Sequence, residues 1–210
     1  MSNISISKDE LLDKCQTGDI LLYNSNTFIG RTIEYCSNSK FSHISIILRD
    51  PTYINPELKG LYVIESGSEK IKDVISNKKV IGVQVIPLEY VLSQYENATF
   101  GYLYYRKLNC DRTNGFEEKF KNIILKTDGK PYDLNPLDWI KATFDIEVGD
   151  LHRDNTFWCS ALASYIYINL GFLEEKLPWT IIAPRRFSHF ENERLTFTNC
   201  VLEPERFITF

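Results

Sequence analysis

A cysteine that opens an apolar helical stretch is the residue of this sequence best placed for nucleophilic chemistry. It is Cys159, in the segment Phe-Trp-Cys-Ser-Ala-Leu-Ala-Ser-Tyr. Apolar residues lie around it at helical spacing: Trp158, Leu162, Tyr165 and Ile166. Asn155 and Thr156 are N-cap candidates for this helix, and Gly171 is a candidate C-terminal stop. A thiol in the first turn lies near unpaired backbone N–H groups and the positive end of the helix dipole, and both favour the thiolate. Because a single cysteine on an apolar helix is more often inert packing, the chemistry needs further residues.

Two polar residues occupy predicted strands that are otherwise apolar. His43 lies near the start of the strand predicted over 41–48, and Glu65 lies near the end of the strand predicted over 61–66. If these strands pair, the carboxylate of Glu65 can reach the imidazole of His43, fix its tautomer and favour its protonated form. Such a pair activates a thiol, so Cys159, His43 and Glu65 form a candidate triad. Taken singly, His43 is more often a structural histidine and Glu65 a solvated strand-end charge.

The two other histidines are weaker candidates for a catalytic base. His152 lies in the polar loop before the cysteine helix, where histidines are commonly just solvated. His189 follows Cys159 in the order usual for cysteine proteases, but its surroundings show no strand pattern. A zinc site built from the three histidines and the scattered cysteines lacks the ligand spacing of known zinc motifs. The prediction is therefore a site without metal or cofactor.

The elements that must position these residues are strands in the first half and helices in the second. Alternation and turn residues predict strands over 20–23, 41–48, 61–66, 80–86 and 100–106. Helices are predicted after Ser7, after Asn26, from Phe116 to near Gly129, after Asn135, and over the cysteine segment. Strands joined by loops, with no helix between each pair, indicate an antiparallel sheet. The sequence therefore predicts one α+β domain over 1–210.

Composition limits the function further. The chain has 210 residues and a net charge of −4 with both signs interspersed, so nothing indicates a nucleic-acid partner. Its five cysteines are odd in number and form no C-x-x-C pair, which is typical of a reducing compartment. No leader with a basic and an apolar region is present, and no run approaches the roughly 20 apolar residues that span a bilayer. These features predict a cytoplasmic protein and leave its oligomeric state open.

Five short segments occur in an order that resembles a known superfamily. They are Gly-Asp-Ile-Leu at 18–21, Phe-Ser-His-Ile-Ser-Ile at 41–46, Val-Ile-Glu-Ser at 63–66, Gly-Lys-Pro-Tyr-Asp at 129–133 and Phe-Trp-Cys-Ser at 157–160. The series resembles the permuted branch of the papain-like, NlpC-type thiol hydrolases, and especially its YiiX-like members. A poxvirus protein family belongs to the same group, and lecithin–retinol acyltransferase is a more distant relative. The resemblance spans about 18–184 and leaves 185–210 as a C-terminal tail of uncertain role.

The resemblance implies a fold and a set of residue roles. The fold would be a small antiparallel sheet or barrel packed against helices, with the nucleophile at a helix N-terminus. Cys159 would be the nucleophile, His43 the general base and Glu65 the residue that orients it. Tyr132 matches a tyrosine–aspartate motif and would line the substrate site; packing of a turn tyrosine on the core is the alternative. Acyltransferase-type relatives tend to carry a second histidine as the third residue, so Glu65 favours the YiiX-like side.

Members of this group act on amide, ester or thioester bonds, and lipid-linked or peptide substrates have been proposed for them. The expected activity is thus a hydrolase or acyltransferase that forms an acyl-thioester, and a lipid-linked substrate would bring peripheral membrane contact. One rival is a non-catalytic lipid- or peptide-binding protein on the same scaffold, because fold resemblance does not establish chemistry. A peptidoglycan-directed peptidase is another, and the missing export signal counts against it.

Overall fold

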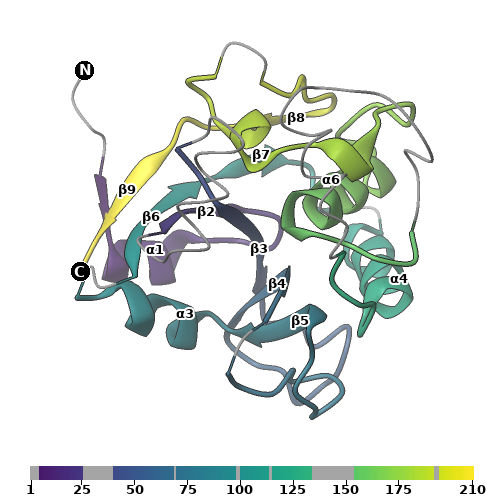
Figure 1. Ribbon diagram of the computed structural model, residues 1–210, viewed down its shortest axis with the longest axis horizontal. Helices are drawn as coiled ribbons and strands as arrows, with labels where there is room; N and C mark the ends of the chain where they lie inside the picture. Colours follow the sequence, from purple (N-terminus) through teal and green to yellow (C-terminus); the bar gives the residue numbers. More distant parts are fainter. Residues whose placement is uncertain are drawn as a thin grey trace.

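A seven-stranded sheet, within the residues that the structure describes, organises the molecule. The computed structural model describes residues 5–25, 40–68, 70–97, 100–113, 115–133, 154–191 and 194–210. The strand order is β1-β9-β6-β2-β3-β4-β5, and the strands follow an arc (Figure 1). Their bounds are β1 Ser5–Ser7, β2 Ile20–Ser25, β3 His43–Arg49, β4 Leu61–Gly67, β5 Gly82–Pro87, β6 Gly101–Arg106 and β9 Arg206–Thr209. All five predicted strands are present.

The pairing of these strands is antiparallel, as predicted, except at one edge. The pairs from β9 through β6, β2, β3 and β4 to β5 are antiparallel, whereas β1 pairs with β9 in parallel. β1 and β5 stand at the two ends of the strand order, so the sheet is open in the described part of the chain. The structure is therefore a mixed α+β fold with an almost wholly antiparallel sheet.

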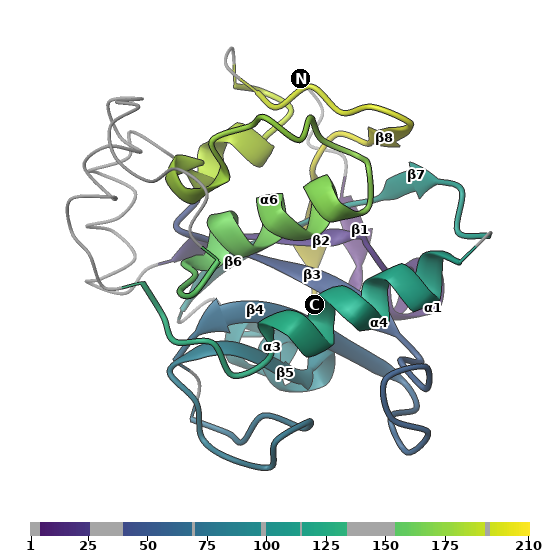
Figure 2. The same cartoon turned by 90° about the vertical axis from the view of Figure 1, so that its right-hand side faces the viewer.

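Helices cover both faces of the sheet. α4 (Phe116–Thr127) and α6 (Cys159–Asn169) pack on one face, and α1 (Lys8–Lys14) and α3 (Leu88–Tyr95) pack on the other (Figure 2). The alternation of β3 divides its side chains between these two cores: Ile44, Ile46 and Leu48 face α4 and α6, while Ile47 faces α1 and α3. His43 and Ser45 share the face of Ile47. In the described residues, no helix has the length and apolar character needed to cross a membrane.

The helices of the first half begin at residues suited to that position. The helix predicted after Ser7 is α1, whose Ser7 hydroxyl accepts the N–H of Glu10 at 3.1 Å. Pro87 ends a strand, as its type predicts, and it is also the N-cap of α3, because its fixed φ suits the start of a helix. The helices predicted after Asn26 and after Asn135 lie outside the described residues.

The aspartate of the Gly-Asp-Ile-Leu segment has a structural role. Asp19 is fully buried where β2 begins. Its carboxylate accepts the backbone N–H of Leu108 at 2.8 Å, the Tyr105 hydroxyl at 2.5 Å and the Arg112 guanidinium at 3.2 Å. Burial raises the pKa of Asp19, and these hydrogen bonds oppose that rise. The residue thus ties the start of β2 to β6 and to the segment that follows β6.

The C-terminal tail, whose role the sequence left open, contributes to both sheets. β8 (Cys200–Leu202) pairs with β7 (Leu108–Cys110) in a separate two-stranded sheet, and β9 joins the main sheet beside β6. Arg106 fastens the tail, because its buried guanidinium donates to the carbonyl of Leu202 at 2.7 Å and to that of Glu203 at 2.5 Å. Two short 3₁₀ turns, η1 (Trp179–Ile181) and η2 (Pro184–Phe187), lead from α6 toward the tail.

Gly82 is expected to be irreplaceable at the start of β5. Its φ is +148°, and a Cβ there would lie 2.1 Å from the carbonyl oxygen of Lys130. We expect Gly82→Ala to lower the free energy of unfolding by roughly 2–4 kcal/mol, from backbone strain plus overpacking. Gly60→Ala is the matched control, because Gly60 has φ +99° but a Cβ added there would meet nothing within 4 Å. Equal losses for the two variants in urea unfolding would contradict the steric explanation.

Candidate active site

Cys159 is the first residue of α6, as its segment predicts, but the helix begins differently from the expectation. The N-cap is Trp158, with no side-chain cap, so the prediction of Asn155 or Thr156 as N-cap was wrong. The Thr156 hydroxyl instead donates to the carboxylate of Asp133 at 3.2 Å. Cys159 is only 3% exposed. Among the described residues, the backbone N–H groups of Cys159 and Ser160 have no acceptor, so two donors are left unpaired beside the thiol.

The residues next to Cys159 are each held by a long-range hydrogen bond. The hydroxyl of Ser66 donates to the carbonyl of Phe157 at 2.6 Å. The indole N–H of Trp158 donates to the carbonyl of Thr180 at 2.8 Å, and the Ser160 hydroxyl donates to that of Ile182 at 2.6 Å. Because Ser66 follows Glu65 on β4, the first of these bonds ties the start of α6 to the strand that carries the predicted carboxylate.

His43 and Glu65 meet on one face of the sheet. The Nε2 atom of His43 lies 2.8 Å from Oε2 of Glu65, and the two side chains are 22% and 2% exposed. β3 and β4 pair with Ile46 opposite Ile64, and continuing that register places Gly67 opposite His43. A Cβ at Gly67 would lie 2.8 Å from Oε1 of Glu65. The glycine therefore leaves room for the Glu65 carboxylate beside the imidazole.

The charges around His43 favour its protonated form. Burial lowers the pKa of the ring, but the charges of Cys159 and Glu65, and hydrogen bonds with both side chains, raise it well above its usual 6.5. An ionised carboxylate only accepts hydrogen bonds, so Nε2 carries a proton. Nδ1 is then the nitrogen that can exchange a proton with the thiol. The structure thus brings Cys159, His43 and Glu65 together, with the imidazole between thiol and carboxylate.

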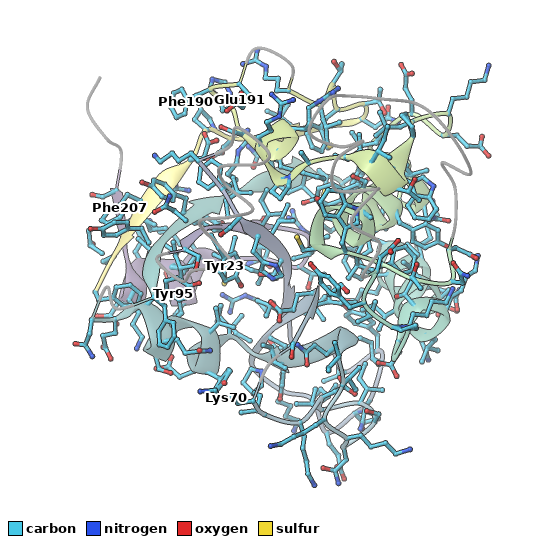
Figure 3. All side chains as sticks on the ribbon, in the orientation of Figure 1. Tyr23, Lys70, Tyr95, Phe190, Glu191 and Phe207 are labelled. Atoms are coloured by element: carbon cyan, nitrogen blue, oxygen red, sulfur yellow. The ribbon has the colours of Figure 1, made fainter. Side chains whose placement is uncertain are left out.

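Tyr23, from β2, lies beside the imidazole of His43, and Tyr95, from α3, lies beside Tyr23. The Tyr23 ring contacts His43 edge to face, with centroids 4.8 Å apart, and Tyr23 and Tyr95 lie close together at 5.7 Å (Figure 3). The hydroxyls of Tyr23 and Ser45 share a buried hydrogen bond of 2.7 Å. The edge-to-face contact with Tyr23 limits rotation of the imidazole.

Tyr132 lies in the same neighbourhood. The segment 129–133 connects the start of β5 with the residues before α6. The N–H of Tyr132 donates to the carbonyl of Ile81 at 3.1 Å, and the N–H of Phe157 donates to the carbonyl of Pro131 at 3.1 Å. Burial, followed by the negative charges of Cys159, Glu65 and Asp133, raises the pKa of Tyr132 far above 10. The hydroxyl therefore stays protonated and within electrostatic reach of the thiol and the carboxylate.

The remaining candidates lie elsewhere or outside the described residues. The ring of His189 packs against Phe190, and its backbone N–H donates to Glu205 at 2.7 Å. His152 lies outside the described residues. Within the described ranges, no group of three or more His, Cys, Asp or Glu side chains is arranged to hold a metal ion.

Sequence reasoning missed a fourth polar residue of this cluster, Gln84. It lies opposite Glu65 in the pairing of β4 with β5, is fully buried, and donates from Nε2 to Oε1 of Glu65 at 3.1 Å. The signal was present, because Gln84 interrupts the apolar run Val83-Gln84-Val85-Ile86 in the way that His43 and Glu65 interrupt theirs.

No protein-family model matches the chain, and no curated protein matches it. Among solved structures, the chain is similar to the crystal structure of the metalloprotein YiiX from Escherichia coli O157:H7. The TM-score is 0.47 and the sequence identity 20%, over 90% of this chain and 89% of that one. A function for this chain therefore has to rest on the geometry of its own residues.

Proposed function

We propose that the protein is a cysteine-dependent hydrolase or acyltransferase that cleaves an amide, ester or thioester bond through an acyl-thioester on Cys159. One observation carries the proposal: the His43 ring is held by the buried Glu65 carboxylate and interacts with Cys159, which starts a helix. A purely structural histidine needs neither a buried carboxylate nor a thiol beside it. A binding protein gains nothing from that costly burial of charge.

The proposed reaction has two acyl-transfer steps. Nδ1 of His43 takes the proton of the Cys159 thiol, the sulfur attacks the substrate carbonyl carbon, and a tetrahedral oxyanion forms. The unpaired N–H groups of Cys159 and Ser160 are the proposed donors to that oxygen; loss of one such donor typically costs about 10²–10³ in rate. The imidazolium then protonates the leaving group, and an acyl-thioester remains. Water or another acceptor gives a proton to His43, attacks the thioester and regenerates the thiol.

Glu65 and Tyr132 have supporting parts in this scheme. Glu65 accepts the Nε2–H hydrogen bond of His43 and stabilises the imidazolium. Tyr132, protonated and near the thiol, is proposed to contact the substrate. The proposal places the chain with permuted papain-like enzymes of the YiiX-like kind, since the His-bearing strand precedes the Cys-bearing helix. Lipid-linked or peptide acyl donors are the proposed substrates, and the scheme uses no cofactor.

Selective alkylation tests the thiol directly. At pH 7 we expect iodoacetamide to modify Cys159 faster than Cys15, Cys110 and Cys200, measured by mass spectrometry of peptides. Burial raises the pKa of Cys15 to about 11, that of Cys200 to about 12, and also that of Cys110, so these three thiols stay protonated. Replacing His43 with alanine should slow the modification of Cys159 by about ten-fold, because the proton acceptor is lost.

His189→Ala is the matched control, because that imidazole packs on Phe190 and takes no part in the scheme. It should leave the rate at Cys159 unchanged. Modification of Cys159 at the rate of Cys110, with no response to His43→Ala, would contradict the proposed function. The scaffold would then be better described as a binding protein.

A further inference from the structure

We infer that Gln84 is a positioning residue of this site, whose amide holds the second oxygen of Glu65 and keeps the carboxylate aimed at His43. The inference rests on the proposed function. It adds a fourth member, from β5, to a set that otherwise comes from β3, β4 and α6. Gln84 touches neither the thiol nor the substrate in this scheme and acts through Glu65 alone.

The geometry divides the Glu65 carboxylate between two partners. Oε2 binds Nε2 of His43 at 2.8 Å, and Oε1 accepts the amide N–H of Gln84 at 3.1 Å. Glu65 and Gln84 are direct partners in the register of β4 and β5, so their side chains leave the sheet on the same face. With both oxygens bound, the carboxylate cannot rotate about its terminal bond without losing a hydrogen bond.

The carbonyl oxygen of the Gln84 side chain indicates why position 84 is a glutamine. Its Oε1 atom is buried and has no hydrogen-bond donor in the described part of the chain. Leaving a buried carbonyl unpaired is unfavourable, and an apolar side chain of the same size would avoid that cost. The opposite amide orientation would place Oε1 of Gln84 against Oε1 of Glu65, which is repulsive while Glu65 is ionised. The amide N–H group is therefore the part that the site uses.

Gly67, on the same strand as Glu65, leaves space for this pair of side chains. A Cβ at Gly67 would lie 2.8 Å from Oε1 of Glu65 and 3.6 Å from Nε2 of Gln84. The absence of that atom lets the carboxylate and the amide meet. Glu65 is thus held by a donor on each neighbouring strand, and its own strand leaves the space it occupies.

The test uses two variants and two measurements that do not need the natural substrate. Gln84→Met keeps the length of the side chain and removes the donor, while Gln84→Glu replaces the amide by a carboxyl group. We measure the pKa of His43 by NMR with labelled histidine, which has only three signals in this chain, and the rate of Cys159 alkylation. In Gln84→Met the pKa of His43 should fall, and alkylation should slow by about ten-fold, by analogy with the loss of a hydrogen-bond partner that orients a metal ligand.

Gln84→Glu should behave differently with pH, which a merely structural role would not produce. While the new carboxyl is protonated it can donate to Oε1 of Glu65, so alkylation should stay close to that of the wild type at low pH. Once it ionises, two carboxylates face each other, and the alkylation rate relative to the wild type should fall as the pH rises. The titrating groups that interact with Glu65 are His43 and Tyr132, and both of these also interact with Cys159. All three are unchanged in the variant.

A Glu65→Gln reference separates this inference from the proposed function. If Glu65→Gln lowers the pKa of His43 but neither Gln84 variant changes titration or alkylation, the positioning role is overturned and the triad stands. If Glu65→Gln has no effect either, the role of Glu65 fails and the inference fails with it. Should Gln84→Met not fold, the pH profile of Gln84→Glu decides: a profile parallel to that of the wild type overturns the role.

Discussion

Replacing Cys159 with alanine is expected to abolish acyl transfer and leave the fold in place. The sulfur is the attacking atom in the proposed scheme, and removal of a nucleophile of this kind costs about 10⁶ in kcat. The side chain is small, so the cavity left in the core should lower the free energy of unfolding by only about 1 kcal/mol. The pKa of His43 should also fall, because the charge and hydrogen bond of Cys159 raise it in the wild type.

Intact-protein mass spectrometry measures this loss without knowledge of the natural substrate. The probes are a p-nitrophenyl ester, an acyl-coenzyme A thioester and a short peptide ester. The wild type should gain one acyl group, located at Cys159 by peptide mapping, and the variant should gain none. Cys110→Ala is the matched control, because this half-buried thiol belongs to β7 and should not affect acylation. Unchanged turnover in Cys159→Ala would rule out the proposed mechanism.

The features that could be predicted from the sequence are those set by local periodicity. Alternation places Ile44, Ile46 and Leu48 on one face of β3 and His43 on the other, because the period of two holds wherever one face is buried. The same reasoning led to Glu65, since a carboxylate within an apolar run needs a partner. Pairing of β3 with β4 then brings the two side chains to 2.8 Å.

The features that could not be predicted depend on contacts between distant segments. Thr156 is a good N-cap by type, yet its hydroxyl donates to Asp133. The N-cap is instead Trp158, with no side-chain cap, and α6 begins at Cys159. The partnership of Gln84 with Glu65 depends on the register of β4 and β5, which no local pattern sets. β9 could not be predicted for the same reason, because its four residues form a strand only by pairing with β1 and β6.

Glu65→Gln should separate the charge of the carboxylate from its shape. The amide keeps the size of the side chain, but it removes the charge and weakens the hydrogen bond that help to raise the pKa of His43. That pKa should fall, since burial then opposes protonation with less compensation. The corresponding change in a serine protease lowers kcat by about 10⁴, and we expect a loss of that order in acyl transfer. Glu57→Gln, the same change at an exposed site, is the matched control.

The pH dependence of stability gives a second, independent readout of the same variant. In the wild type the folded pKa of His43 lies above the unfolded value of about 6.5. Protonation of His43 therefore stabilises the folded state fully below about pH 6.5, and this contribution is lost as the pH rises through the folded pKa. In Glu65→Gln the loss should become smaller and shift to lower pH, as measured by urea unfolding at several pH values. Identical pH profiles for the two proteins would mean that Glu65 does not hold the proton on His43, and the imidazole would then depend on Cys159 alone.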